Sequence, residues 1–473
     1  MSDNRRNFLK LTGLTGLGLA GGILKGFAGV HDSDGNPARR DESLKADRFN
    51  MSGYAAPKLE TVRVGFIGLG QRGPTHLKNM TKMGGVSVMG LCDVREESAL
   101  NAKKLMKDTG QDPTIYSGNK DEWKKLCDRK DVDLIFIATP WSMHVPMAVY
   151  AMEQGKHVAI EVPAAVTVEE CWKLVETSER TRKHCMMLEN CCYDFFELMT
   201  LNMARQGFFG EIIHTEGAYI HYLLDLNFSK KGYWDMWRLK ENIGRNGNIY
   251  PTHGLGPICQ VMNINRGDKM EYLVSMSGID IGMGEKAKEL AGKDEFYKPF
   301  VNKSYRGNMN TTVIRTGKGR TIMIQHDVTT PNVYSRIHKI SGTKGSALKY
   351  PLPGKISSSH EKWFTEEELK SLEKTYQPPI VKKVGELAKQ VGGHGGMDFL
   401  MDWRLIDCLR NGLPLDQDVY DAALWSAIAP LSDRSVGHRS SSVDIPDFTR
   451  GFWKQNKPVD ITLEVGGNTT VKL

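Results

Sequence analysis

A glycine-rich segment followed by an acidic residue is the clearest chemical signature in this chain. The segment GLGQRG at residues 68–73 follows a β-branched apolar run at 61–67 and precedes a helical pattern at 74–83. Glycines at this spacing let the backbone turn tightly and approach a pyrophosphate, which the N-terminus of the next helix attracts. Asp93 ends the next apolar run, where a carboxylate binds the ribose hydroxyls of an adenine dinucleotide. The spacing predicts bound NAD, while Arg95 keeps NADP as the alternative.

Further polar and aromatic side chains come directly after apolar runs. Trp141 and His144 follow the run at 133–138, Glu161 ends another run, and Asn190 follows the run at 185–188. In a doubly wound sheet, residues just past the carboxyl ends of the strands line the cofactor crevice. We therefore expect these side chains to meet at one edge of a sheet.

The elements that position these residues alternate between strand and helix up to residue 190. Helical patterns at 145–154 and 168–183 separate the apolar runs, and Gly155 is a typical helix-ending residue. This alternation predicts an α/β fold that begins with a Rossmann-type doubly wound parallel sheet.

The remainder of the chain has a different pattern. Stretches that alternate between apolar and polar residues predict a large, open, mostly antiparallel sheet in an α+β domain; they lie at 212–222, 311–315, 321–328 and 336–340. Residues 397–427 are expected to be helical and to pack back on the first domain. The polar stretches 284–306 and 351–380 are expected to be loops or insertions.

The first residues are typical of an export signal and not of a folded domain. RRNFLK at residues 5–10 precedes a short apolar, Gly-rich run and a small-residue exit, and the pattern resembles the twin-arginine signal. We expect a signal peptide at 1–29, a flexible leader at 30–59, an NAD-binding domain at 60–190 and a substrate-binding domain at 191–473. The protein would then be periplasmic or secreted, with no membrane span after processing.

Composition narrows the class of protein. The chain has 473 residues, 40% hydrophobic and 25% charged, which excludes a disordered chain or a collagen-like repeat. The formal charge is +7, but residues 1–28 hold four basic residues and one acidic residue, so the mature chain is near +4. No long basic run remains, so we expect no nucleic-acid partner. The eight cysteines have no metal-binding spacing and are expected to be buried free thiols.

Several motifs resemble those of known enzymes. GFIGLGQRG at 65–73, TPWSMH at 139–144 and the strand end Glu161-Val162-Pro163 resemble the glucose–fructose oxidoreductase and inositol dehydrogenase superfamily. Typical members have a catalytic Lys where this chain has Val162. They also have an acidic residue where this chain has Ile249, four positions before the substrate-domain His.

A branch of that superfamily resembles the chain more closely. WSMHVPMA, AIEVPAA, YPTHGLGP at 250–257 and HGGMD at 394–398 are similar to the exported, NAD-dependent α-N-acetylgalactosaminidases of glycoside hydrolase family 109. Together with the glycine motif, the resemblance implies that NAD is bound by Gly68, Gly70, Gln71, Arg72, Gly73, Asp93, Trp141, Ser142, Met143, His144, Glu161, Val162 and Asn190. It implies sugar contacts from Tyr219, Arg238, Tyr250, Pro251, Thr252, His253 and Tyr334.

The resemblance also implies a mechanism with no net redox change. Hydride leaves carbon 3 of the sugar, the proton on carbon 2 is then removed, the aglycone leaves, water adds and the hydride returns. His253 is the expected base at the carbon 3 hydroxyl, because imidazole titrates near neutral pH. Tyr250, Tyr219 and Tyr193 are unranked candidates for the carbon 2 proton, and a buried structural tyrosine is the alternative for each. Arg238 is expected to orient or polarise the sugar oxygens.

Other interpretations stay open at this point. The aromatic stretch 219–237 is either a sugar-stacking surface or core. We expect no metal site, since His394 and Asp398 lack a third ligand, and a Gly-hinged loop over the site is the preferred interpretation of that segment. The expected partner is a glycan, and a homodimer is compatible with the sequence. The alternative function is a periplasmic NAD(P)-dependent sugar oxidoreductase.

Overall fold

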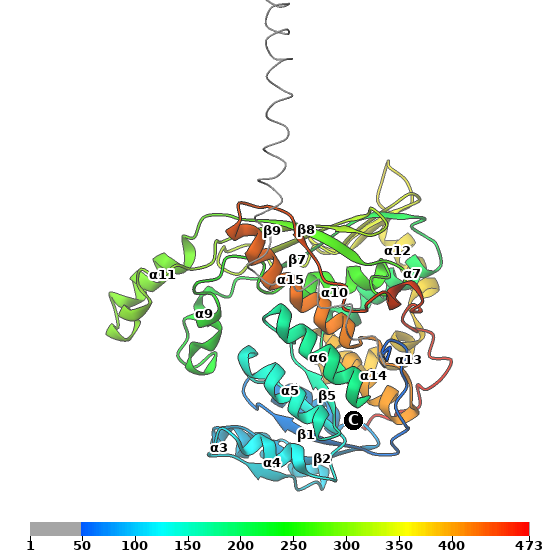
Figure 1. The fold of residues 1–473 in the computed structure, drawn as a ribbon. Helices are drawn as coiled ribbons and strands as arrows, with labels where there is room; N and C mark the ends of the chain where they lie inside the picture. The colour runs from blue at the N-terminus through cyan, green and yellow to red at the C-terminus, as the bar shows by residue number, and fades with distance from the viewer. Residues whose placement is uncertain (1–48, 473) are drawn as a thin grey trace, which may run out of the picture. The chain divides into compact units, whose positions relative to one another are not determined.

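A computed structural model describes residues 49–472, which form one compact unit. The expected signal peptide at 1–29 and most of the expected leader lie outside the described residues. Figure 1 shows the arrangement of the helices and strands. Among the described residues, no helix is both long enough and apolar enough to cross a membrane.

The first half of the unit is built on a six-stranded parallel sheet, as predicted. The strand order is β3-β2-β1-β4-β5-β6, so the direction of winding reverses between β1 and β4, which is where dinucleotides bind in such sheets. The strands are β1 (Val62–Ile67), β2 (Val86–Cys92), β3 (Thr114–Tyr116), β4 (Leu134–Ile137), β5 (His157–Ile160) and β6 (Cys185–Met187). The helices between them are α2 (Gly73–Thr81), α3 (Glu96–Lys104), α4 (Glu122–Asp128), α5 (His144–Glu153) and α6 (Val168–Thr181).

The second half contains an eight-stranded sheet, in the order β13-β12-β11-β7-β10-β9-β8-β14. Only the β7–β10 pair is parallel among the described strands of this sheet, which confirms the expected mostly antiparallel sheet. The strands are β7 (Ile212–Ile220), β8 (Met270–Ser277), β9 (Asn310–Thr316), β10 (Thr321–Asp327), β11 (Lys339–Gly342), β12 (Ser346–Leu348), β13 (Lys355–Ser357) and β14 (Val443–Asp444).

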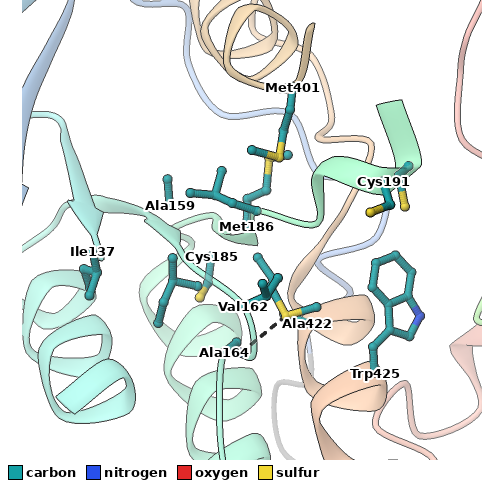
Figure 2. Packing of buried hydrophobic residues seen from close by; sticks show 14 of the residues in the cluster. Ile137, Ala159, Val162, Ala164, Cys185, Met186, Cys191, Met401, Ala422 and Trp425 are labelled. Atoms are coloured by element: carbon teal, nitrogen blue, oxygen red, sulfur yellow. Dashed lines mark hydrogen bonds between the residues drawn. The ribbon is translucent and has the colours of Figure 1, made fainter. Parts of the chain in front are cut away.

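Helices α14 (Met397–Asn411) and α15 (Val419–Gly437) connect the two sheets. α14 packs against α2, and α15 packs against both α6 and β8 (Figure 1). Figure 2 shows Met401 of α14 beside Met186 of β6, and Trp425 of α15 near Cys191, which follows β6. Trp425 is 1% exposed, so the hydrophobic core continues without a break from one sheet to the other.

Two stretches expected to be loops or insertions contain helices, which corrects the expectation of loops. Residues 284–306 contain most of α11 (Gly282–Ala291) and the 3-10 helix η6 (Glu295–Phe300), and residues 351–380 contain α12 (Glu366–Tyr376). A capping box between Thr365 and Glu368 starts α12. α12 combines strong helix formers with a short apolar stripe of Leu369, Leu372 and Tyr376, which packs on the core, in a segment that is otherwise polar. α13 (Pro379–Val391) follows directly.

Further α-helices of the second half are α7 (Phe195–Arg205), α8 (Leu224–Asn227), α9 (Trp237–Glu241) and α10 (Thr252–Val261). Its further 3-10 helices are η4 (Asn190–Tyr193), η5 (Trp234–Met236), η7 (His394–Gly396) and η8 (Phe452–Lys454).

The end of the expected leader is packed in this structure. Met51 is 3% exposed, and its backbone N–H donates to the Tyr420 hydroxyl at 3.1 Å. Leu59 donates to the Leu409 carbonyl at 3.1 Å. Residues 49–59 therefore differ from a flexible leader, because α14 and α15 offer them an apolar surface and backbone partners.

All eight cysteines are buried with free thiols, as predicted.

Candidate active site

The glycine loop between β1 and α2 fits a dinucleotide. Gly68 has φ +90°, and a Cβ on it would lie 2.5 Å from the Ala138 carbonyl oxygen. A Cβ on Gly73 would collide with the Gly68 carbonyl. On exposed Gly70, a Cβ would meet only the Arg95 guanidinium, at 3.7 Å. The first and third glycines are thus required by packing, while the second leaves open space where a pyrophosphate can approach the backbone.

Asp93 supports this loop from the end of β2. One carboxylate oxygen accepts the Leu69 N–H at 2.8 Å and the other accepts the Arg95 N–H at 2.9 Å. The residue is only 7% exposed. Asp93 therefore holds the glycine loop against β2, and each of its oxygens keeps a second lone pair for a ribose hydroxyl.

Arg72, at the start of α2, joins the ends of two strands. Its Nε is 2.8 Å from Glu161 Oε1, and its Nη1 is 3.1 Å from Asp398 Oδ2. Asn190 Nδ2 donates to Asp398 Oδ1 at 2.5 Å. The structure thus brings Arg72, Glu161 and Asn190 together as expected. Arg72 binds Glu161 directly, whereas Asp398, which the sequence motifs did not assign to this group, links Arg72 to Asn190.

The charges in this group stabilise one another. Burial raises the pKa of Glu161, but Arg72 and His76 outweigh it and hold that pKa well below its usual range. His76 Nδ1 is 2.8 Å from Asp402, and its Nε2 is 3.0 Å from Glu161 Oε1. Burial alone would lower the pKa of His76, yet the two carboxylates raise it to about 9. His76 and Asp402 were missed because neither follows a strand.

The segment after β4 has a mainly structural histidine. His144 is fully buried, and its two ring nitrogens lie 2.8 Å from the carbonyl oxygens of Thr139 and Pro163. The two ring nitrogens therefore fasten this segment to the end of β5, and the predicted contact of His144 with NAD remains a prediction. Ser142 is exposed, while Met143 is half-buried.

Val162 is 5% exposed and follows Glu161 directly. Gln71 is exposed beside Gly70 and is free to face a ligand. The cofactor contacts predicted for these residues remain predictions.

The predicted sugar-binding aromatic residues form one cluster. The ring of Tyr219, near the end of β7, lies 4.8 Å from Tyr250, 5.1 Å from His253 and 6.4 Å from Tyr334. Trp141 stacks on Tyr250 at 5.7 Å, which joins this cluster to the segment after β4.

Arg238, from α9, covers the same cluster. Its guanidinium lies 4.5 Å from the centre of the Tyr250 ring and 5.2 Å from that of Trp141, at cation–π distances. Pro251 and Thr252 are buried at the start of α10 and fix the adjacent His253. The expected grouping of Tyr219, Arg238, Tyr250 and His253 is thus present.

His253 has a buried carboxylate partner. Its Nδ1 lies 2.7 Å from Glu189 Oε1, and Glu189 is fully buried. Burial by itself would raise the pKa of Glu189. His253 and the Cys191 N–H outweigh burial, so the pKa of Glu189 falls below its ordinary value. Within the described residues, His253 Nε2 has no hydrogen-bond partner and so is available to a ligand. Glu189 was missed although it follows β6, next to Asn190, and its position was the signal.

Tyr193 lies outside this cluster, which corrects its place among the candidate catalytic residues. The residue is 2% exposed, and its hydroxyl donates to Asp416 Oδ2 at 3.3 Å. Arg404 also binds Asp416, at 3.0 Å. This buried network explains Tyr193 as a structural residue.

Three possible metal ligands also meet at this point, namely Glu189, Cys191 and His253, whose ligand atoms lie within 4.8 Å of one another. The Glu189–His253 hydrogen bond already explains their proximity. We assign no metal to this group.

Comparison with known proteins agrees with this architecture. Residues 62–189 match the family described as "Oxidoreductase family, NAD-binding Rossmann fold", and residues 193–455 match "Glycosyl hydrolase 109, C-terminal domain". The "Glycosyl hydrolase family 109 protein 1" of Bacteroides fragilis is 50% identical over 428 residues, covering 87% of this chain and 90% of that protein. The "Alpha-N-acetylgalactosaminidase" of Bacteroides fragilis is 52% identical over 412 residues, covering 86% of this chain and 96% of that protein.

Solved structures with a similar fold are more distant in sequence. A levoglucosan dehydrogenase in complex with NADH and levoglucosan has a TM-score of 0.61 at 17% identity and covers 82% of this chain and 100% of its own. A myo-inositol dehydrogenase from Lactobacillus casei, in complex with NAD(H) and myo-inositol, has a TM-score of 0.54 at 15% identity and covers 82% of this chain and 99% of its own.

Proposed function

The chain belongs to glycoside hydrolase family 109, and from this premise we propose that it hydrolyses terminal α-linked N-acetylgalactosamine with the help of bound NAD. The α-N-acetylgalactosaminidase named above supports the choice of sugar. The observation that carries the proposal is the stacking of Trp141 on Tyr250 at 5.7 Å. This contact joins the carboxyl edge of the dinucleotide-binding sheet to the cluster that holds His253.

The proposed route is oxidation, elimination, addition of water and reduction, with no net redox change. Bound NAD supplies a hydride acceptor that later returns the hydride. Two features of the chain would hold NAD: the glycine loop, with open space at Gly70, and the group of side chains around Arg72 at the strand ends.

His253 is the proposed base at the sugar hydroxyl. Glu189 accepts a hydrogen bond from Nδ1–H of the neutral imidazole, so the lone pair of the ring lies on Nε2. Glu189 also stabilises the imidazolium that forms, because its charge is buried 2.7 Å away. The geometry is that of a general base fixed by a carboxylate.

Arg238 and the aromatic rings are proposed to bind the sugar. Arg238 presents a half-buried positive charge that polarises an adjacent carbonyl or hydroxyl oxygen. Tyr219, Tyr250 and Tyr334 offer hydroxyl groups and ring faces to the sugar. Val162 has no ionisable group where typical sugar dehydrogenases of the superfamily have a catalytic lysine. This substitution favours a mechanism in which other residues take the role of that lysine.

Export through the twin-arginine route to the periplasm or the medium belongs to the proposal, supported by RRNFLK at residues 5–10. A homodimer is also proposed. It is supported by exposed apolar side chains on the outer face of the second sheet, namely Tyr272 and Met276 of β8 and Val313 of β9. Light scattering would measure the molar mass of the mature protein in solution, which distinguishes a dimer from a monomer.

One experiment separates the proposed hydrolase from the alternative oxidoreductase. The purified protein is examined by absorbance for tightly bound NAD and then incubated with a panel of aryl glycosides. Cleavage of the aryl α-N-acetylgalactosaminide without accumulation of NADH supports the proposal. Stoichiometric NADH without cleavage would overturn it and favour the oxidoreductase.

A further inference from the structure

His221 is a histidine of the site that the proposed function leaves without a role. It follows the end of β7, two residues after Tyr219, so both side chains project from the same face of the strand. The Tyr219 hydroxyl lies 2.8 Å from His221 Nδ1. The two rings meet edge to face at 5.4 Å, and the ring of His221 also packs on Tyr334 at 4.9 Å. Tyr219 therefore has a nitrogen base directly behind it.

The surroundings of His221 keep its ring neutral. Burial lowers its pKa, and the nearby charges of Arg238, His253 and His394 lower it further, to about 4. At neutral pH the imidazole is therefore uncharged. In the tautomer with its proton on Nε2, this neutral imidazole accepts the Tyr219 hydrogen bond at Nδ1.

Tyr219 cannot act as a simple base at carbon 2. Burial raises the pKa of its hydroxyl well above the usual value, so the phenol is protonated at neutral pH. A protonated phenol can accept a proton from carbon only while it gives up its own. Among the described residues, His221 is the hydrogen-bond partner of this hydroxyl.

We propose that His221 is the proton acceptor behind Tyr219 in the elimination step, a proposal that rests on the proposed function. The carbon 2 proton moves to Tyr219 Oη as the phenol proton moves to His221 Nδ1. The electron pair of the C–H bond becomes the double bond between carbons 1 and 2, and the aglycone oxygen leaves carbon 1 with its own pair. The proton on His221 then returns through Tyr219 to that oxygen.

The surrounding positive charges favour the return of the proton from His221 to the leaving oxygen. An imidazolium at residue 221 faces Arg238, His253 and His394, which repel it and make it a strong acid toward the leaving oxygen. The Glu189–His253 pair remains available for the sugar hydroxyl. His221 acts through Tyr219 and is therefore a positioning and relay residue.

The test separates proton transfer at carbon 2 from hydride transfer at carbon 3. The NAD-loaded protein is incubated with N-acetylgalactosamine in D2O. Nuclear magnetic resonance measures exchange of the carbon 2 proton, and near-ultraviolet absorbance measures bound reduced nicotinamide. In His221→Asn, whose amide oxygen can accept the hydrogen bond but not the proton, exchange should fall roughly 10²-fold while the absorbance signal is unchanged.

Two further measurements complete the test. The variant should discriminate more strongly than wild type between a nitrophenyl and an alkyl aglycone, because the alkyl oxygen needs the returned proton. His221→Gln is measured in parallel so that the outcome does not depend on one variant folding. His214→Gln, on the outer part of β7 beside Thr321 and Glu216, is the matched control and should behave as wild type.

The possible outcomes are distinct. Wild-type exchange rates in folded His221→Asn and His221→Gln would overturn the relay. Equal losses of exchange and of the absorbance signal would also overturn it, since His221 would then only shape the site. Absence of both signals in the wild type would overturn the proposed function itself.

Discussion

His253 Nδ1 lies 2.7 Å from Oε1 of Glu189, whose side chain is fully buried. The two residues belong to α10 and to the end of the parallel sheet, so this hydrogen bond connects the two halves of the protein at the site. A carboxylate in this position fixes both the tautomer of the imidazole and the direction of its free nitrogen.

Replacing Glu189 with Gln should lower turnover of an aryl glycoside by about 10²-fold or more. The amide of Gln donates to Nδ1, which places the ring proton on Nε2 and removes the lone pair that the base requires. Steady-state kinetics would measure the loss. Glu179→Gln is the matched control, because Glu179 is also buried but bonds to Tyr420 and Arg450 away from the site. Equal losses in both variants would show that a general fold defect is responsible.

Tyr219→Phe and Tyr193→Phe should have opposite effects. Tyr219 lies in the aromatic cluster, so its variant should lose roughly 10²-fold in turnover with little change in stability. Tyr193 bonds to Asp416, so its variant should keep its turnover and lose about 1 kcal/mol of unfolding free energy. Turnover assays and urea denaturation would distinguish them. Loss of turnover in a folded Tyr193→Phe would contradict its placement outside the site.

Two glycines of one loop should fail in different ways. In Gly68→Ala, φ +90° and the contact with the Ala138 carbonyl should cost roughly 2–4 kcal/mol of stability. In Gly70→Ala, the Cβ meets only open space and Arg95, so stability should stay within about 1 kcal/mol of wild type. Its bound nucleotide should nevertheless decrease, because the Cβ fills the approach to the backbone. Thermal unfolding measures the stability, and the nucleotide released on denaturation measures the binding. A Gly70→Ala variant that retains a full complement of nucleotide would contradict the assignment of the glycine loop as the pyrophosphate site.

The His76 ion pairs should make stability depend on alkaline pH. Its pKa is raised to about 9 in the folded protein, so its contribution is complete below the ordinary value of 6.5 and disappears as pH rises through 9. The loss should be on the order of 1–3 kcal/mol. Urea denaturation between pH 6 and pH 10 would measure it. His76→Gln should flatten this dependence, and an unchanged pH profile in that variant would contradict the assignment.

The sequence by itself determined the features that depend on local pattern. The glycine loop, the strand–helix alternation and the parallel class of the first sheet follow from side-chain periodicity and turn chemistry within short segments. The position of Asn190 and Glu161 after strands was likewise sufficient to expect them at one edge. α11 and α12 were not expected as helices, because charged residues dominate both segments and their apolar stripes are short.

Only the tertiary structure decided which side chains act together. Glu189 and His253 are 64 residues apart, Arg72 and Asp398 are 326 apart, and Tyr193 and Asp416 are 223 apart. Such pairs depend on how α10 and α14 pack against the sheet edge, and burial then makes an unpaired charge costly. Packing therefore gave His253 its carboxylate and moved Tyr193 out of the site.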